Sequence, residues 1–161
     1  MTAPRWLDTE EMQLWRSLLQ ASARLLERLD DELLAAHDLS LPDYEVLVHL
    51  SEAPERRCRM SELADRALMS RSRLTYRINR LEAAGLVVRA PCDEDRRGWF
   101  AVLTPVGQEV LEHAAPTHVL GVRRHLLDHV RRDELVPIAD VFSRVAAALE
   151  GLEEDRPGRG S

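Results

Sequence analysis

Two short helical segments followed at once by two β-rich segments lie between Ser61 and Thr104, and few folds accommodate that order. The first segment, Glu62–Arg66, follows Ser61, which is a good N-cap residue. The second begins at Ser70, after a tight turn, and ends near Gly85, where a left-handed residue commonly terminates a helix. Its apolar residues recur at helical spacing, at Leu74, Ile78 and Leu81. Two short helices joined by a tight turn predict a helix-turn-helix.

A β-hairpin is predicted directly after this motif. Leu86–Arg89 and Trp99–Leu103 are rich in β-branched and aromatic residues, and the polar segment Cys92–Gly98 lies between them. A hairpin in this position is a wing. The sequence therefore predicts a winged helix-turn-helix lobe over residues 40–104.

Amphipathic helices precede the recognition motif. A long apolar stripe over residues 6–36, interleaved with arginine and glutamate, predicts one extended helix. Ser40 is an N-cap candidate, and Pro42 stands near the first position of a second helix that runs to about Glu52. Ala53–Glu55 is expected to end that helix because it contains a proline.

Two further helices follow the wing. Thr104 and Pro105 open a helix that is expected to bend at Pro116 and to continue through Val130. The last helix is expected to begin near Asp133. The predicted fold class is therefore mainly α (α+β), a winged helix-turn-helix with N- and C-terminal helices that form a dimerisation domain.

The terminal helices carry apolar seams larger than a small winged lobe can cover. We therefore expect residues 1–39 and 105–152 to form the dimerisation helices of a homodimer, with 153–161 as a disordered tail. The predicted interface contains Trp15, Leu18, Leu135, Ile138, Phe142, Val145 and Leu149. A two-fold dimer presents two recognition helices, so a palindromic target is expected, with half-sites about 10 bp apart.

Charge is distributed unevenly along the chain. The net charge of −6 argues, taken alone, against nucleic-acid binding. Between Arg56 and Phe100, however, eleven arginines face six acidic residues, a local balance of +5 that leaves −11 for the rest of the chain. This segregation predicts a basic functional face within an acidic scaffold.

The second helix of the motif is expected to present a polar face to the major groove of DNA. The residues at the N-terminus of such a helix usually meet base edges. The predicted set is Ser70, Arg71, Ser72, Arg73, Thr75 and Tyr76. Arg73 is the first choice for a guanine contact, whereas Arg71, Arg77 and Arg80 lie nearer the flanks and are expected to meet phosphates. The alternative is an arginine-rich face that is merely solvated.

The wing carries a second cationic feature. Arg96 and Arg97 are placed at the hairpin tip, where long cationic side chains can enter a minor groove. Asp95 is expected to support the loop by pairing with Arg97. The alternative is a solvated run of charges.

Four motifs resemble the MarR family of bacterial regulators: Met60–Ala64, Arg80–Val87, Asp93–Gly98 and Leu103–Gly107. The resemblance covers the chain from Trp6 to about Leu149. It implies a dimer interface built from the first and last two helices, a wing arginine at Arg97, repression of nearby genes, and release of DNA on binding a small ligand or on oxidation. Tyr76 departs from the arginine that the family often has there.

Several other classes of protein lack support in the sequence. No apolar run is long enough to span a membrane, and the N-terminus shows no signal pattern, so a soluble, cytoplasmic protein is expected. There is no phosphate-binding glycine loop, GxSxG elbow or HExxH motif, so no enzyme is predicted. Neither a cofactor nor a metal is predicted. A winged-helix module that binds protein instead of DNA remains an alternative.

The effector is not specified by the sequence. His125 and His129, at i and i+4, could present two metal ligands, but ordinary surface or interface histidines are the favoured interpretation. Trp6, Trp15 and Tyr44 could line a ligand pocket, or they could pack in the core or at an interface.

Oxidation is an alternative signal. Cys58 precedes the helix-turn-helix and Cys92 lies at the base of the wing, so oxidation of either could disturb DNA docking. Nearby arginines could lower the pKa of the Cys58 thiol.

Overall fold

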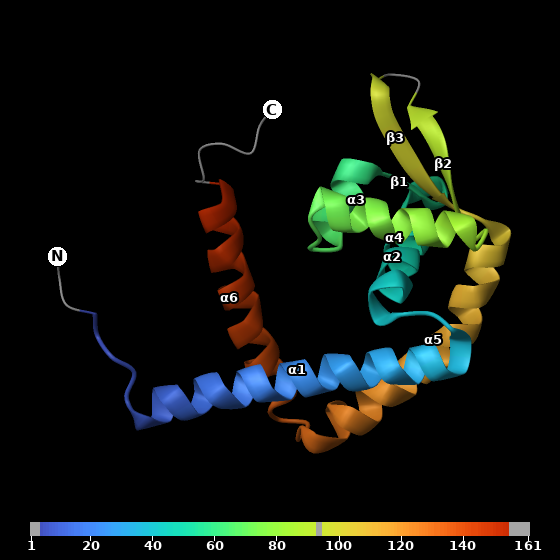
Figure 1. Ribbon diagram of the computed structural model, residues 1–161. Helices are drawn as coiled ribbons and strands as arrows, with labels where there is room; N and C mark the ends of the chain where they lie inside the picture. Colours follow the sequence, from blue (N-terminus) through green and yellow to red (C-terminus); the bar gives the residue numbers. More distant parts are fainter. Residues whose placement is uncertain (1–3, 93–94, 155–161) are drawn as a thin grey trace. The chain divides into compact units, whose positions relative to one another are not determined.

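The computed structural model describes the backbone of residues 4–92 and 95–154 and the side chains of 4–92 and 98–151. It divides into two compact units, one up to Val122 and one from Arg123 onward. The first contains helices α1 (Thr9–His37), α2 (Leu41–Glu52), α3 (Met60–Arg66) and α4 (Arg71–Ala83), strands β1 (Arg57–Arg59), β2 (Val87–Cys92) and β3 (Asp95–Leu103), and most of α5 (Pro105–His125). Figure 1 shows the hairpin of β2 and β3 beside α4. This arrangement confirms the predicted mainly helical winged helix-turn-helix.

Two predicted helix starts are confirmed by their caps. Ser40 and Ser70 accept hydrogen bonds from the backbone N–H groups of Asp43 and Arg73, which begins α2 and α4 as expected. The first helix is also capped, but by Asp8, so it begins at Thr9, three residues later than predicted.

Ser61 is not an N-cap, so that prediction is wrong. The chain turns helical at Met60, directly after β1, and Arg59 occupies the cap position without a side-chain hydrogen bond. The predicted end of the following helix is confirmed, because Gly85 adopts a φ of +72°.

The sheet has three antiparallel strands in the order β1-β3-β2. Strand β1 is not among the elements predicted from the sequence, and its Cys58 pairs with Ala101 of the central strand β3. The hairpin strands are longer than predicted, because Pro91 and Cys92 extend β2 and β3 begins at Asp95, inside the predicted loop. The wing is therefore a longer ribbon than the alternation of residues indicated.

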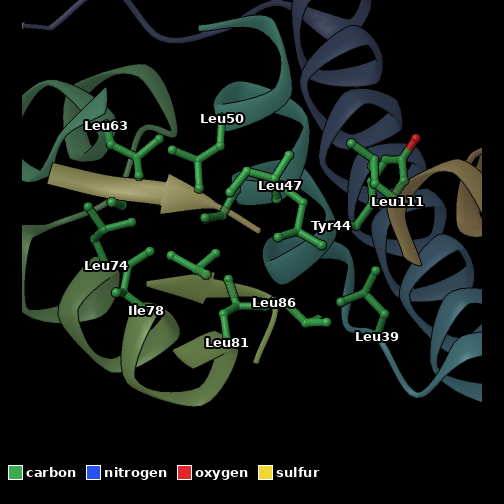
Figure 2. Packing of buried hydrophobic residues seen from close by; sticks show 14 of the residues in the cluster. Leu39, Tyr44, Leu47, Leu50, Leu63, Leu74, Ile78, Leu81, Leu86 and Leu111 are labelled. Atoms are coloured by element: carbon green, nitrogen blue, oxygen red, sulfur yellow. The ribbon is translucent and has the colours of Figure 1, made fainter. Parts of the chain in front are cut away.

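One apolar cluster holds the helix-turn-helix on the rest of the first unit. Figure 2 shows Leu47 and Leu50 of α2 packed towards Leu63 of α3 and Leu74 and Ile78 of α4. All five side chains are fully buried. Burying a leucine or isoleucine contributes about 1.5–3 kcal/mol, so this cluster fixes α4 and leaves its opposite face to solvent.

The second unit contains the end of α5, a 3₁₀ turn at Leu127–His129 and α6 (Leu135–Glu154). The fifth helix ends at His125, so the prediction that it continues through Val130 is wrong. The last helix begins at Leu135, and it extends through Glu154, two residues into the predicted tail. Residues 155–161 of that tail lie outside the described part of the chain.

Candidate nucleic-acid interface

The two faces of α4 differ sharply in burial. Leu74, Ile78 and Leu81 are buried as predicted, which turns the other side of the helix outward. That side exposes Ser72, Thr75 and 59% of Tyr76. The hydrogen bond from the Arg73 backbone N–H to Ser70 Oγ caps the first turn of α4. The exposed side chains of this turn carry hydroxyl and guanidinium groups.

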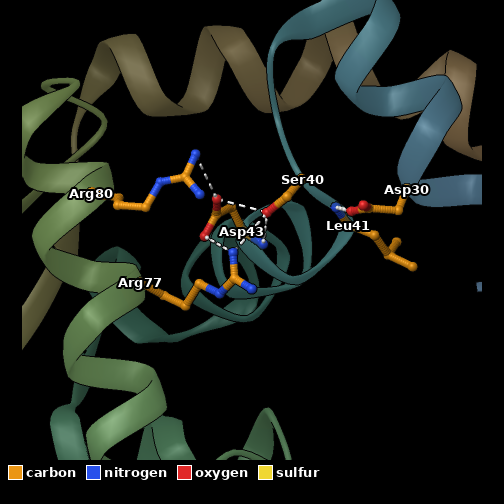
Figure 3. A network of polar contacts seen from close by, with 6 residues as sticks. All are labelled: Asp30, Ser40, Leu41, Asp43, Arg77 and Arg80. Carbon is orange, nitrogen blue, oxygen red and sulfur yellow. Dashed lines mark hydrogen bonds and ion pairs between the residues drawn. The ribbon is translucent and has the colours of Figure 1, made fainter. Parts of the chain in front are cut away.

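The arginines of α4 fall into two groups. Arg71 and Arg73 are exposed and have no side-chain polar partner among the residues that the structure describes. Arg77 and Arg80 instead turn towards α2, as Figure 3 shows. Arg77 Nη1 lies 3.1 Å from Ser40 Oγ and 3.5 Å from Asp43 Oδ1, and Arg80 Nη2 lies 3.8 Å from Asp43 Oδ2.

The wing is tied to the second half of α4 by Arg89 of β2. Arg89 Nη2 donates to Asn79 Oδ1 at 2.6 Å, and Nη1 forms an ion pair with the Glu82 carboxylate. The backbone N–H of Arg89 donates to Glu82 at 3.2 Å. These contacts fix the base of the hairpin relative to the helix, so the two predicted DNA-reading elements have one relative orientation.

A basic hollow lies between the start of α3, α4 and the wing. It has a volume of about 590 Å³. Among the side chains that line it are Arg59, Ser61, Arg71, Thr75, Arg89 and Trp99. Arg71 is exposed at this surface and suits an anionic partner, whereas Arg89 already pairs with Glu82 and Arg59 contacts Cys92. Of these residues, only Ser61, Arg71 and Thr75 belong to the helix-turn-helix that the sequence singled out.

The predicted wing residues cannot be placed in full. Asp95, Arg96 and Arg97 belong to β3 by their backbone, but their side chains lie outside the described part of the structure. Their contacts with DNA and the Asp95–Arg97 pair therefore stay predictions.

The environment of the cysteines differs from expectation. Both thiols are buried. Burial and the nearby Glu62 carboxylate raise the pKa of Cys58, and Arg66 offsets this only in part. The arginines therefore do not lower the pKa of Cys58, because desolvation of the thiolate outweighs the attraction of Arg66. Cys92 Sγ lies 3.1 Å from Arg59 Nη2.

The aromatic and histidine candidates are dispersed. Tyr44 is a core residue that stacks on His118 with ring centroids 4.7 Å apart, whereas Trp6 and Trp15 are exposed. Burial lowers the pKa of His118. Within the described residues, no group of three or more potential metal ligands is found.

The predicted dimer residues are uncovered in the single chain. Trp15 and Leu18 on α1 and Ile138, Phe142, Val145 and Leu149 on α6 are exposed, and Leu135 is half-buried.

No helix in the described part of the chain is long and apolar enough to cross a membrane.

Sequence reasoning missed the partners of the buried Asp43. The Ser40–Asp43 spacing signals a helix start, and the structure shows this as well as a 2.7 Å hydrogen bond from Ser40 Oγ to Asp43 Oδ2. No local pattern links Asp43 to Arg77, because the two residues are distant in sequence and meet only when α4 packs on α2.

Comparison with known proteins places this architecture in a family. The sequence profile of the MarR family matches residues 37–98. The crystal structure of AbsC, a MarR family transcriptional regulator from Streptomyces coelicolor, is 41% identical, covers 92% of this chain and 99% of its own, and superposes with a TM-score of 0.87. Sco3205, a MarR family regulator from the same organism solved in complex with DNA, is 39% identical over 98% of this chain and 96% of its own, with a TM-score of 0.88.

A sequence relative adds a functional description. The HTH-type transcriptional repressor YetL from Bacillus subtilis is 25% identical over 143 residues, which are 87% of this chain and 85% of that protein. The relatives are regulators of transcription and not enzymes. With the two near-complete structural matches above 30% identity, they show that this chain belongs to the MarR family of winged helix-turn-helix transcriptional regulators.

Proposed function

We propose that this regulator is a cytoplasmic homodimer that binds a palindromic operator in duplex DNA and represses transcription until a small molecule is bound. The observation that carries the proposal is the N-terminal half of α4. It is an exposed, capped helix end with two arginines that have no polar partner among the described side chains. The DNA complex of Sco3205 supports this use of the fold.

The proposed division of labour follows the surroundings of each residue. Ser70, Ser72, Arg73, Thr75 and Tyr76 read base edges in the major groove, and Arg71 contacts a phosphate. The wing places Arg96 and Arg97 against the neighbouring minor groove, with Asp95 in support.

The homodimer is supported by uncovered apolar side chains on both units. Exposed leucine, valine and aromatic side chains recur along α1 and α6, and a chain that left them in water would carry large apolar patches. We propose that a second copy of the chain packs against these side chains. Repression is a separate point, which is supported by the description of YetL as a repressor.

A cavity in the first unit is the proposed effector site. It has a volume of about 580 Å³ and lies between α1, α2 and α4. Its walls combine apolar Leu26 and Leu34 with charged Asp30 and Arg80. Because α4 forms part of the wall, an occupant can alter the position of the recognition helix. The redox alternative is less well supported, because both thiols are buried and that of Cys58 has a raised pKa.

The decisive experiment is selection of bound fragments from genomic DNA by the purified full-length protein, followed by mobility shifts. Wild type is expected to return one palindromic motif, while a variant with Arg71→Gln and Arg73→Gln loses it. The matched control, Arg16→Gln with Arg24→Gln, removes the same charge from α1 and should keep the motif. Recovery of random sequence by wild type would favour the protein-binding alternative.

A further inference from the structure

A buried carboxylate faces the recognition helix from α2. Asp43 is 2% exposed and lies in the first turn of α2. One carboxylate oxygen accepts from Ser40 Oγ at 2.7 Å and lies 3.8 Å from Arg80 Nη2, and the other lies 3.5 Å from Arg77 Nη1. Figure 3 shows both arginines reaching from α4 to this point.

The two arginines are held to different degrees. The Arg77 side chain is only 25% exposed and donates to Ser40 as well as approaching Asp43, whereas the Arg80 side chain is 48% exposed and has the longer contact. A buried carboxylate is costly without a cationic partner. Arg77 is therefore the principal counter-charge of Asp43.

Arg77 also borders the surface proposed to meet DNA. Its side chain lines a hollow of about 370 Å³ together with Ser72, Arg73 and Tyr76. Its guanidinium carbon lies 5.9 Å from the centroid of the Tyr76 ring. A rotation of this long side chain away from α2 would carry its charge towards that hollow. The orientation of Arg77 therefore decides whether its guanidinium pairs with Asp43 or is available to DNA.

We propose that Asp43 is a positioning residue that holds Arg77 against α2 and keeps it off the phosphate backbone, so that α4 engages DNA through its N-terminal half. The inference rests on the proposed function, because the restraint acts on DNA binding only if α4 binds DNA. It revises the sequence-based expectation that Arg77 meets a phosphate.

The salt dependence of binding tests this directly. Each phosphate neutralised by a protein cation steepens the plot of log K against log salt by about 0.9. Asp43→Asn keeps the shape of the side chain but releases Arg77, so the slope on unrelated duplex DNA is expected to steepen by about 0.9 per protomer. For a dimer this corresponds to an additional loss of about tenfold in affinity between 50 and 200 mM salt.

Three further variants make the result decisive. Glu45→Gln removes the same charge from an exposed position on α2 and should leave the slope unchanged. Arg77→Gln should leave the wild-type slope unchanged, and combining it with Asp43→Asn should restore that slope. The reverse pattern, in which Arg77→Gln alone flattens the slope and Asp43→Asn does not alter it, would show that Arg77 already contacts phosphate and would overturn the proposal.

Folding and the underlying function are checked separately. Circular dichroism establishes whether each variant is folded. If Asp43→Asn is unfolded, Arg77→Gln still tests the proposal, because the proposal requires that this variant keep the wild-type salt slope. Absence of DNA binding by wild type would refute the proposed function and the restraint with it. Normal wild-type binding with an unchanged slope in Asp43→Asn would refute the restraint alone.

Discussion

The four arginines of α4 share one helix but not one environment. Arg71 and Arg73 extend from the capped first turn, while Arg77 and Arg80 turn back to a carboxylate on α2. The desolvated Asp43 favours the second arrangement because a buried charge needs a partner. Equal side chains on one helix can therefore have unequal roles in binding.

Replacing Arg73 by alanine is expected to relax base preference at one position in each half-site. A bidentate arginine–guanine contact contributes about 1–3 kcal/mol of discrimination. The measurement is selection from random duplex DNA, scored position by position. Arg71→Ala, two residues earlier on α4, should instead weaken binding to all sequences alike. An identical motif from wild type and Arg73→Ala would contradict the assignment.

Stability should fall in mild acid because of His118. Its pKa is lowered by burial from an ordinary value of 6.5, so the folded chain resists the proton that the unfolded chain accepts. The free energy of unfolding is therefore highest above pH 6.5. It falls as the pH drops from 6.5 towards the lower pKa that His118 has in the folded chain. Urea unfolding at about pH 7.5 and about pH 5.5, at one protein concentration, measures the loss.

His118→Phe keeps an aromatic ring beside Tyr44 but cannot be protonated, so it should reduce that pH dependence. His113→Gln is the matched control, because His113 is exposed on the same helix. An equal pH dependence in wild type and His118→Phe would exclude His118 as the source.

At the level of elements, α4 and the wing act as one body. Arg89 joins β2 to Asn79 and Glu82 on α4, and the apolar cluster fixes the other side of the helix. A displacement of α4 therefore carries the base of the hairpin with it. Under the proposed function, an effector that shifted α4 would therefore alter the contacts of both α4 and the wing with DNA.

Replacing Arg97 by alanine is expected to weaken binding to every sequence and to flatten the salt slope by about 0.9 per lost contact. The reason is that a wing arginine in a minor groove responds to the potential of the backbone more than to base identity. Titrations at several salt concentrations measure both effects. Arg24→Ala removes the same charge from an exposed position on α1, and a slope that changed equally in both variants would remove the wing from the mechanism.

Local signals predicted most elements but not their long-range contacts. The caps at Ser40 and Ser70, the stripe from Leu74 to Leu81 and the left-handed Gly85 follow from neighbouring residues, and the structure confirms each. Strand β1 was missed because three residues give no alternation, and it forms only because β3 offers an open edge. The Asp43–Arg77 contact was missed because it forms only when α4 packs on α2.

At the level of the whole molecule, apolar side chains are exposed on α1 and α6. The net positive charge lies elsewhere, because residues 56–100 carry a balance of +5 and the rest of the chain −11. A homodimer would cover the apolar residues and present two basic lobes to one duplex. In the proposed homodimer, dimerisation and operator symmetry would therefore both follow from one interface.

Phe142→Glu is expected to separate the dimer, because it places a charge at the centre of the proposed α6 seam. Sedimentation equilibrium measures the change in mass. Ala147→Glu adds the same charge on the opposite side of the helix and should leave the dimer intact.

The same pair of variants tests how the dimer reads its operator. Two recognition helices related by a two-fold axis match half-sites about 10 bp apart, so inserting about 5 bp turns one half-site to the far side of the duplex. Wild type and Ala147→Glu should then lose most of their affinity for the selected operator. Phe142→Glu, which binds one half-site at a time, should bind the normal and the lengthened operator equally. If wild type also ignored the insertion, each lobe would be binding independently, and the symmetric dimer would not be the DNA-binding unit.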